Sequence, residues 1–234
     1  MAKIVILSGA GISAQSGIST FRDSGGLWEE YNIRDICYAG CLDTNYDETI
    51  EFYDKRRLDI KDKIPNKAHI KIKELKDKYP DDIAVITQNV DDLFEKAGCC
   101  DVIHLHGFLR EIKCMSCNYI EDIGYDSLQN KEKECPKCSN SRFRPNIVFF
   151  AEAAPMYAVL EKELQDCEVL VVIGTSGNVI NTDGLLNPKI KYSILNNLEP
   201  SDAINDKLYS KVLYKKVTEA IDEIIYDIEK YICK

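Results

Sequence analysis

The 234-residue sequence lacks the marks of a membrane protein, a secreted protein or a basic nucleic-acid-binding protein. No apolar run approaches the roughly 20 residues that a membrane-spanning helix needs. The first apolar segment begins at residue 3, which leaves no room for a signal or transit peptide, so we expect a cytoplasmic protein. The 30 basic and 39 acidic residues give a net charge of −9, which argues against a nucleic-acid partner held through phosphate contacts.

Internal repeats, low-complexity segments and proline-rich linkers are also lacking. The length is enough for one sizeable α/β domain plus a small module, and the 45% content of hydrophobic residues argues against long disordered stretches. Ten cysteines are present without an export signal, so we expect metal ligands and buried thiols instead of disulfide bonds. We expect a monomer that binds neither nucleic acid nor membrane.

What is present is an alternation of short apolar runs with helical segments. The expected strands lie at 3–7, 83–87, 102–105, 169–173, 192–195 and 211–214. The expected helices lie at 49–60, at 66–78, from 92 onward, at 156–166 and at 217–232. This alternation predicts an α/β fold in which a parallel sheet carries helices on both faces.

The first expected strand is followed by Gly9-x-Gly11-x-x-Ala14, a pattern typical of the turn into a helix at a dinucleotide site. We expect Gly9 to form the tight turn, Gly11 to let the backbone approach a pyrophosphate, and Ala14 to let the helix pack closely. The helix N-terminus then offers N–H groups to the phosphates. Residues 21–66 contain no second strand that ends in an acidic residue, so we expect an enzyme that covers its dinucleotide with a segment of its own.

Two Cys-x-x-Cys pairs, Cys114 with Cys117 and Cys135 with Cys138, flank the polar segment 118–134. Such pairs supply four thiolates in a tetrahedron and leave no position for water, so we expect one structural zinc ion. The polar segment has too few apolar residues to form a core, which makes the metal a condition for folding. Two redox disulfides are the alternative interpretation.

Two insertions, at about 28–65 and 108–145, interrupt the strand–helix alternation. We expect the first to be helical and the second to bind zinc, and the two together to form a smaller domain. The remaining residues, 1–27, 66–107 and 146–234, are expected to form a Rossmann-like nucleotide-binding domain.

Polar side chains follow four of the expected strands. His104 and His106 stand two residues apart at one strand end, so both are expected to face the same side. The other three strand ends carry Gln88, Asn89, Val90 and Asp91; Gly174, Thr175 and Ser176; and Asn196, Asn197, Leu198 and Glu199. Because ligands bind at the carboxyl ends of strands in an open α/β sheet, we expect these ends to converge on one crevice. His69 lies in an expected helix and is interpreted as a cap or packing residue.

These motifs resemble the sirtuin family of NAD-dependent protein-lysine deacylases. The resemblance rests on GAGIS at 9–13, GISTFR at 17–22, TQNVDDL at 87–93, HLHG at 104–107, the paired cysteines, GTS at 174–176 and NLEPS at 197–201. It implies a Rossmann-like domain with a small zinc-binding and helical domain, and it implies acyl-lysine proteins as substrates.

The resemblance also implies that the acyl group passes to ADP-ribose as nicotinamide leaves. His106 is then the general base on a ribose hydroxyl, a role suited to a side chain whose ordinary pKa is about 6.5. Asn89 and Asp91 are implied as catalytic residues at the nicotinamide pocket and the ribose. The implied cofactor-binding residues are Gly9, Ala10, Gly11, Ile12, Ser13, Phe21, Arg22, Trp28, Gln88, Asn89, Val90, Asp91, Gly174, Thr175, Ser176, Asn197, Leu198 and Glu199.

Tyr53 and Arg56 resemble the Tyr-x-x-Arg pair with which one sirtuin class binds acyl groups that end in a carboxylate. A guanidinium binds a carboxylate bidentately, and a phenol donates a further hydrogen bond. We therefore expect desuccinylase and demalonylase activity together with deacetylase activity, against the alternative that the pair lies on a solvated helix face. The expected substrate-binding residues are Tyr53, Arg56, Val148, Phe150 and Glu152.

The sequence departs from the resemblance at Cys37, at Ala151, at residues 179–181, which lack the expected proline, and at Gln15, which replaces a common glutamate. Cys37 stands where that class usually carries a small alanine, and its sulfur narrows the expected acyl site. Ala151 replaces the usual glycine, which hinders peptide binding if the position requires a positive φ. Mono-ADP-ribosyl transfer and a non-catalytic NAD-sensing module are the alternative functions.

Overall fold

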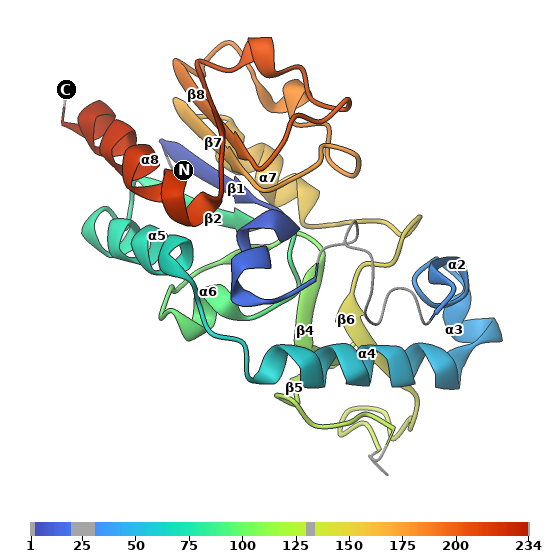
Figure 1. Ribbon diagram of the computed structural model, residues 1–234. Coiled ribbons are helices and arrows are strands. Elements are labelled where there is room, and N and C mark those ends of the chain that lie inside the picture. Colours follow the sequence, from blue (N-terminus) through green and yellow to red (C-terminus); the bar gives the residue numbers. More distant parts are fainter. Residues whose placement is uncertain (1–2, 20–30, 130–133, 234) are drawn as a thin grey trace.

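A six-stranded parallel sheet forms the centre of the larger part of the molecule (Figure 1). The computed structural model describes residues 3–19, 31–129 and 134–233. The strands are β1 (Ile4–Ser8), β2 (Ile83–Thr87), β3 (Ile103–His104), β7 (Val169–Ile173), β8 (Tyr192–Asn197) and β9 (Lys211–Tyr214). Their order, β3-β2-β1-β7-β8-β9, is that of doubly wound nucleotide-binding folds and reverses between β1 and β7. The expected Rossmann-like sheet is confirmed.

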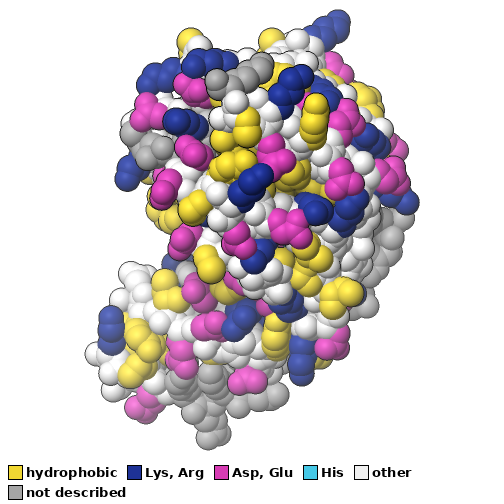
Figure 2. Space-filling view, turned by 90° about the vertical axis from the view of Figure 1, so that its left-hand side faces the viewer, with side chains coloured by type: hydrophobic (Ala, Val, Ile, Leu, Met, Phe, Trp, Pro, Cys, Tyr) yellow, Lys and Arg dark blue, Asp and Glu magenta, His cyan; other side chains and the backbone are white. Residues whose placement is uncertain are grey.

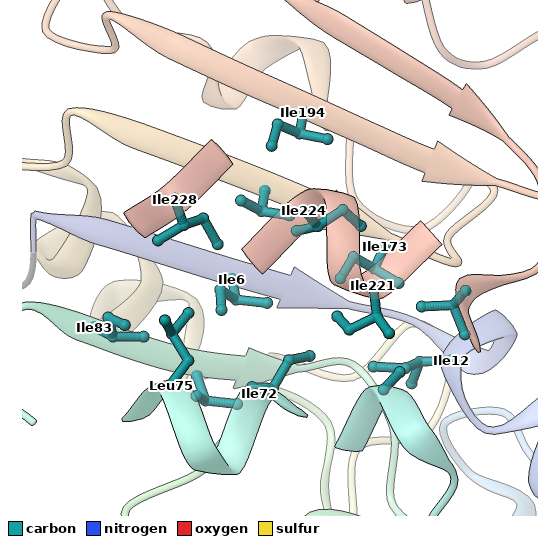
Figure 3. Packing of buried hydrophobic residues seen from close by; sticks show 14 of the residues in the cluster. Ile6, Ile12, Ile72, Leu75, Ile83, Ile173, Ile194, Ile221, Ile224 and Ile228 are labelled. Carbon is teal, nitrogen blue, oxygen red and sulfur yellow. The ribbon is translucent and has the colours of Figure 1, made fainter. Parts of the chain in front are cut away.

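Successive residues of the central strands bury side chains on opposite faces of the sheet. Ile4 and Ile6 pack beneath helices α5 (Lys67–Lys78) and α8 (Val217–Ile232), and Figure 3 shows Ile6 among Ile72 and Ile221. Val5 and Leu7 point to the other face, which α7 (Tyr157–Leu164) covers. Because both faces are covered, all five residues of β1, β2 and β7 are buried.

A capping box starts helix α5 where the sequence predicts it. The side chain of Asn66 accepts a hydrogen bond from the Ala68 amide at 2.9 Å, and the Asn66 amide donates to His69 Nδ1 at 3.3 Å. The His69 ring is fully buried against Phe94, with ring centroids 4.9 Å apart. The interpretation of His69 as a cap and packing residue is therefore confirmed.

A second, smaller sheet is antiparallel and has the order β5-β4-β6. It consists of β4 (Gly107–Cys114), β5 (Ile120–Asp122) and β6 (Phe143–Ile147). Helix α4 (Tyr46–Lys61) lies against it, and α2 (Ile33–Ile36) and α3 (Cys41–Thr44) pack at the N-terminal end of α4 (Figure 1). Phe52 and Ile60 of α4 share a core with Ile112 and Phe143 of the sheet. The two expected insertions thus bury their apolar side chains together.

The helix expected directly after β1 is not formed. Residues Ala10–Ile12 and Ala14–Ser16 form two short 3₁₀ turns, and Gly17 leaves the second turn with φ 79°. The Asn66 side chain donates a 2.8 Å hydrogen bond to the Ile12 carbonyl. In a continuous helix this carbonyl would accept from a backbone amide of the next turn, but here its partner is a side chain from a distant segment. The prediction failed because this partner is distant in sequence.

The face formed by α5 and α8 carries charged side chains of both signs next to one another (Figure 2). Lys67 pairs with Asp222, and Lys78 pairs with Glu229 at 2.7 Å, so the two helices are joined by ion pairs across their exposed sides.

Among the described residues, no helix is both long and apolar enough to span a bilayer.

Candidate functional site

Three glycines bring the ends of β1 and β7 into close contact at the point where the strand order reverses. The Gly11 amide donates to the Gly174 carbonyl at 2.8 Å. A Cβ on Gly9 would lie 2.8 Å from the Gly174 oxygen, and a Cβ on Gly11 would lie 2.7 Å from the Gly174 Cα. Gly174 itself has φ 63°. Glycine is required here chiefly by the contact between two loops, a reason that differs from the turn and pyrophosphate roles expected from the sequence.

A cavity of about 450 Å³ opens above these glycines; we call it the nucleotide cavity. Predicted cofactor-binding residues line it, namely Gly9, Ala10, Gly11, Gln88, Asn89, Gly174, Thr175, Ser176, Asn197, Leu198 and Glu199, as does His106. Asn197 Nδ2 donates to the Thr175 carbonyl at 2.9 Å, and Gln88 Nε2 donates to Thr175 Oγ1 at 3.1 Å. The ends of β2, β7 and β8 are thus tied together as the wall of one crevice.

Lys215 and Lys216 also line the nucleotide cavity. No motif in the sequence pointed to them, because they follow β9 as ordinary surface lysines. Their placement beside Glu199 depends on the parallel pairing of β8 with β9.

A second cavity of about 370 Å³ adjoins the first; we call it the acyl cavity. The predicted site residues that line it are Ala10, Ser13, Tyr53, Arg56, Gln88, Asn89, Val90, Asp91, His106, Val148, Phe150 and Glu152. Ala10, Gln88, Asn89 and His106 line both cavities, so they stand at the junction between them.

A chain of hydrogen bonds fixes the polar residues at this junction. Asn89 Nδ2 donates to Ser13 Oγ at 3.0 Å, and Ser13 Oγ donates to Asp91 Oδ2 at 2.9 Å. Asp91 also accepts from the Leu93 amide at 3.1 Å. Burial raises the pKa of Asp91, and these two hydrogen bonds oppose the rise.

The contacts of His106 favour a neutral ring that is protonated at Nδ1. Its Nδ1 lies 2.9 Å from the Gln88 carbonyl, which can only accept, so Nδ1 carries the proton. Its Nε2 lies 2.9 Å from the Tyr157 hydroxyl and therefore accepts from it. Burial lowers the pKa of His106, and the Gln88 carbonyl offsets part of this effect. At neutral pH the ring can accept a proton.

His104, two residues away, is held in the opposite state. Its Nδ1 lies 2.9 Å from the Asn89 carbonyl, and its Nε2 lies 2.9 Å from the Glu95 carboxylate. A carbonyl and a carboxylate both accept, so this pair of contacts favours the protonated ring, in which both nitrogens donate. Burial alone would lower the pKa of His104, but the contacts with Glu95 and Asn89 outweigh it and raise the pKa. Both histidines reach the 88–89 loop, as their spacing predicts.

Tyr53 and Arg56 project from α4 into the acyl cavity. The Tyr53 ring stacks on Phe149 with centroids 5.5 Å apart, and its hydroxyl donates to Cys37 Sγ at 3.2 Å. Only 10% of the Arg56 side chain is exposed, and Arg56 pairs with Asp59 at 3.6 Å. Burial raises the pKa of Cys37 to about 11, so this residue stays a thiol. The pair does not lie on a solvated helix face.

The segment around Ala151 is held by its own contacts. The Phe150 amide donates to the Cys37 carbonyl at 2.8 Å, and the Phe150 carbonyl accepts from the Ala39 amide at 2.9 Å. Glu152 binds Arg144 at 2.7 and 2.9 Å and accepts from the Phe149 amide. Ala151 has φ 66°, the left-handed conformation that favours glycine.

The four expected zinc ligands converge. Cys114 Sγ lies 3.6 Å from Cys138 Sγ, Cys117 Sγ lies 3.5 Å from Cys135 Sγ, and all four sulfurs lie within 4.8 Å of one another. Tetrahedral zinc with Zn–S bonds of about 2.3 Å places its sulfurs about 3.8 Å apart, so the cluster fits zinc.

Each cysteine pair is shaped by a similar turn. Asn118 and Ser139, four residues after the first cysteine of each pair, have φ 60° and 55°. Their backbone amides donate hydrogen bonds to the carbonyls of Cys114 and Cys135. The local backbone therefore turns both thiols of each pair toward the same point.

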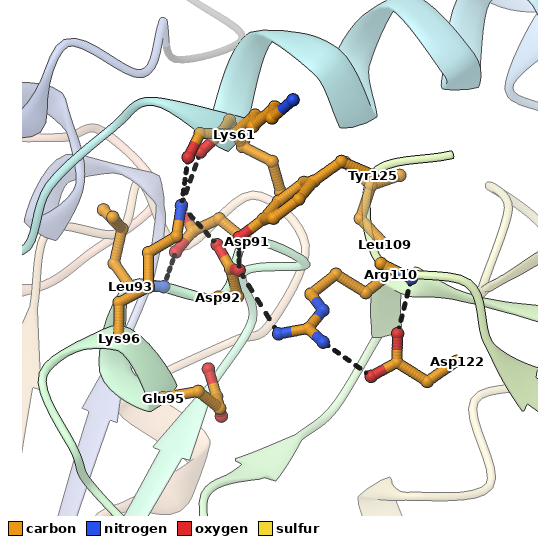
Figure 4. A network of polar contacts seen from close by, with 12 residues as sticks. Lys61, Asp91, Asp92, Leu93, Glu95, Lys96, Leu109, Arg110, Asp122 and Tyr125 are labelled. Atoms are coloured by element: carbon orange, nitrogen blue, oxygen red, sulfur yellow. Dashed lines mark hydrogen bonds and ion pairs between the residues drawn. The ribbon is translucent and has the colours of Figure 1, made fainter. Parts of the chain in front are cut away.

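A polar network connects the two sheets beside Asp91 (Figure 4). Asp92 is fully buried. Its carboxylate accepts a hydrogen bond from the Tyr125 hydroxyl and forms ion pairs with Lys96 at 3.1 Å and with Arg110 at 3.8 Å. Lys96 also donates to the Ile60 carbonyl at 2.7 Å, at the end of α4. The network thus joins the 88–92 loop, the β4–β5 region and the helix that carries Tyr53.

The remaining predicted residues fall elsewhere. Phe21, Arg22 and Trp28 lie outside the described residues. Ile12 lines neither cavity, because its side chain is buried in the core between the sheet, α5 and α8. Tyr157 lines the acyl cavity and contacts His106, but no motif signals it.

Comparison with known proteins gives a family match and full-length relatives. Residues 9–181 match the Sir2 family. The chain is 46% identical over 231 residues to the NAD-dependent protein deacylase of Campylobacter jejuni (strain RM1221), covering 99% of this chain and 97% of the relative. It is 40% identical over 255 residues to the NAD-dependent protein deacylase of Helicobacter hepaticus (strain ATCC 51449 / 3B1), covering 99% of each.

Solved structures show the same likeness. A Sir2 homologue mutant in complex with ADP-ribose has a TM-score of 0.85 and 30% identity, with 98% of this chain and 93% of that chain covered. A structure titled Sir2 bound to acetylated peptide has a TM-score of 0.76 and 27% identity, with 97% and 93% covered.

Proposed function

Because this chain belongs to the Sir2 family and is an NAD-dependent protein deacylase, we propose that it removes succinyl, malonyl and acetyl groups from lysine side chains. The observation that carries the acidic-acyl part is the position of Arg56, a largely buried guanidinium on the wall of the acyl cavity. A buried cation facing a cavity favours a ligand with a carboxylate at that end. Acetyl-lysine fits the same cavity without using this contact.

The nucleotide cavity fits NAD. Gly9, Gly11 and Gly174 line it without side chains, and Thr175, Ser176 and Asn197 add polar groups beside them. NAD, when bound, supplies the ADP-ribosyl group that receives the acyl group as nicotinamide leaves. We propose that the lining residues bind its nucleotide half and that Lys215 and Lys216 lie near that half.

His106 is the proposed general base. Its Nε2 faces the junction of the two cavities and carries no proton, so it can take one from a hydroxyl brought to that point. The Gln88 carbonyl fixes the ring through Nδ1 and stabilises the imidazolium that forms. Asn89, Ser13 and Asp91, already linked by hydrogen bonds, are proposed to hold the nicotinamide and ribose end.

The peptide is proposed to bind along Val148, Phe150 and Glu152. Val148 and Phe150 line the acyl cavity, beside which Glu152 is fixed by Arg144. Cys37 lines the acyl cavity next to Tyr53, and we propose that its thiol narrows the space for the acyl group.

The four cysteines of the proposed zinc site are proposed to stabilise the smaller domain and to take no part in the reaction. Residues 28–65 and 108–145 are proposed to form one domain, because α4 packs on β4 and β6 in a shared core. Four sulfur ligands leave no position for a reacting water.

The test is product analysis on an acyl-lysine peptide with labelled NAD. The proposal predicts stoichiometric nicotinamide, deacylated peptide and O-acyl-ADP-ribose, all lost in His106→Gln. Label attached to protein without deacylated peptide would indicate mono-ADP-ribosyl transfer, and NAD binding without any product would indicate a binding module.

A further inference from the structure

Tyr157 touches the nitrogen that the proposed reaction uses. Its hydroxyl lies 2.9 Å from Nε2 of His106, and the two rings pack with centroids 5.8 Å apart. Tyr157 is the first residue of α7, and its side chain is half-buried on the wall of the acyl cavity. The sequence motifs that carry the rest of the site do not include it.

We propose that Tyr157 is a positioning residue for His106: its hydroxyl donates to the neutral ring and holds Nε2 at the junction of the two cavities before substrates bind, and it then gives up this position to the reacting hydroxyl. This inference rests on the proposed role of His106 as general base. It adds a residue that acts through that base.

The direction of the hydrogen bond follows from the protonation of both groups. Burial raises the pKa of Tyr157, so the phenol keeps its proton at neutral pH and acts as the donor. His106 Nδ1 already donates to Gln88, which leaves the Nε2 lone pair as the acceptor. Protonation of Nε2 would reverse this contact, because the imidazolium would then donate and the phenol oxygen would accept.

The same lone pair cannot serve two donors. An imidazole nitrogen accepts one hydrogen bond, so a hydroxyl that is to lose its proton to Nε2 has to replace the Tyr157 hydroxyl. Replacement is feasible because Tyr157 faces the cavity and only its ring is needed for packing against His106.

Other ionisable groups face the acyl cavity, and the test leaves them unchanged. Cys37, Tyr53, Arg56, Asp91 and Glu152 line it. Glu199, Lys215 and Lys216 line the nucleotide cavity on the other side of His106. The ring-nitrogen partners found for His106 in the described part of the chain are the Gln88 carbonyl and Tyr157. A change confined to the Tyr157 hydroxyl therefore reports this one contact.

The experiment compares Tyr157→Phe with wild type by titration of the histidine ring signals in the cofactor-free protein by NMR. The chain has three histidines, and His106→Gln identifies the His106 signal. The contact is stronger for the charged ring than for the neutral ring, because a hydrogen bond from an imidazolium is charge-assisted, so its loss is expected to lower the pKa of His106 by about half a unit to one unit. The acid limb of kcat/KM for NAD is expected to move to lower pH by the same amount. Tyr226→Phe, a change at a side chain 65% exposed on α8, is the matched control and should move neither.

The outcomes separate the inference from the function on which it rests. An unchanged His106 pKa in a folded Tyr157→Phe protein overturns the inference, while loss of deacylation in His106→Gln still supports the proposed base. A lowered His106 pKa with an unmoved acid limb overturns the catalytic relevance of the contact and also the assignment of His106 as base. A parallel shift of both supports the inference.

Discussion

The Lys96 ammonium lies 2.7 Å from the Ile60 carbonyl and so closes the C-terminal end of α4, the helix that carries Tyr53 and Arg56. The same ammonium pairs with fully buried Asp92, one residue after Asp91 (Figure 4). One lysine therefore links the helix of the acyl cavity to the loop of the proposed catalytic residues.

Lys96→Met is expected to lower the free energy of unfolding by about 2 kcal/mol, because it leaves buried Asp92 and the α4 carbonyls with fewer donors. Chemical denaturation measures this loss. Lys61→Met, at an exposed lysine on the same helix end, is the control and should change stability by less than about 0.5 kcal/mol. Equal losses in the two variants would contradict the account.

Ala151→Gly is expected to raise the free energy of unfolding by about 0.5–1 kcal/mol. The native φ of 66° strains an alanine, and glycine adopts it without strain. Ala153→Gly has no such strain to relieve and should destabilise the protein by up to about 1 kcal/mol. Thermal or denaturant unfolding measures the change in the free energy of unfolding for both variants. A loss of stability in Ala151→Gly would contradict the claim that Ala151 is strained.

His69→Gln is expected to make the free energy of unfolding depend less on pH between pH 4 and pH 6.5. Burial lowers the pKa of His69 to about 4 from 6.5, so the unfolded chain binds more protons than the folded one below pH 6.5. The contribution of neutral His69 to the free energy of unfolding is fully present above pH 6.5 and is lost as the pH falls toward 4. The loss between pH 7 and pH 5 amounts to about 2 kcal/mol. Glutamine keeps the acceptor for the Asn66 amide but does not titrate.

The measurement is the difference in unfolding free energy between wild type and His69→Gln at both pH values. Acidic residues common to the two proteins cancel in this difference. Parallel profiles would mean that His69 is not held neutral in the fold.

Cys135→Ser is expected to reduce bound zinc from one ion per chain to near zero, because three sulfurs bind far less tightly than four. Elemental analysis of the purified protein measures this. Cys100→Ser changes an exposed cysteine outside the cluster and should keep the full zinc content. Retention of zinc by Cys135→Ser would show that the four sulfurs do not act as one site.

Much of the fold follows from local signals in the sequence. The strands at 83–87, 169–173 and 211–214 and the helix at 217–232 have the bounds predicted from apolar periodicity. These elements are bounded by clear changes of pattern, and all pack in the central sheet or on it. The zinc ligands follow in the same way, because their spacing alone brings two thiols to each turn.

What the sequence could not predict depends on contacts between distant residues. The bond from Asn66 to the Ile12 carbonyl replaces an expected helix by 3₁₀ turns. Tyr157 meets His106 only because the start of α7 lies beside the segment between β3 and β4, and the Tyr53 hydroxyl meets Cys37 only through the packing of α4. Side-chain partners of this kind leave no periodic trace in the sequence.

The most direct measurement is kcat/KM for matched succinyl-lysine and acetyl-lysine peptides with wild type, Arg56→Met and Tyr53→Phe. The account predicts that Arg56→Met lowers the succinyl value about 30-fold or more, because a buried carboxylate loses its cation, while the acetyl value changes less than about threefold. Tyr53→Phe should have a smaller effect, because its hydroxyl already donates to Cys37. Equal losses on both peptides in Arg56→Met, or a wild-type enzyme inactive on the succinyl peptide, would contradict the acidic-acyl account.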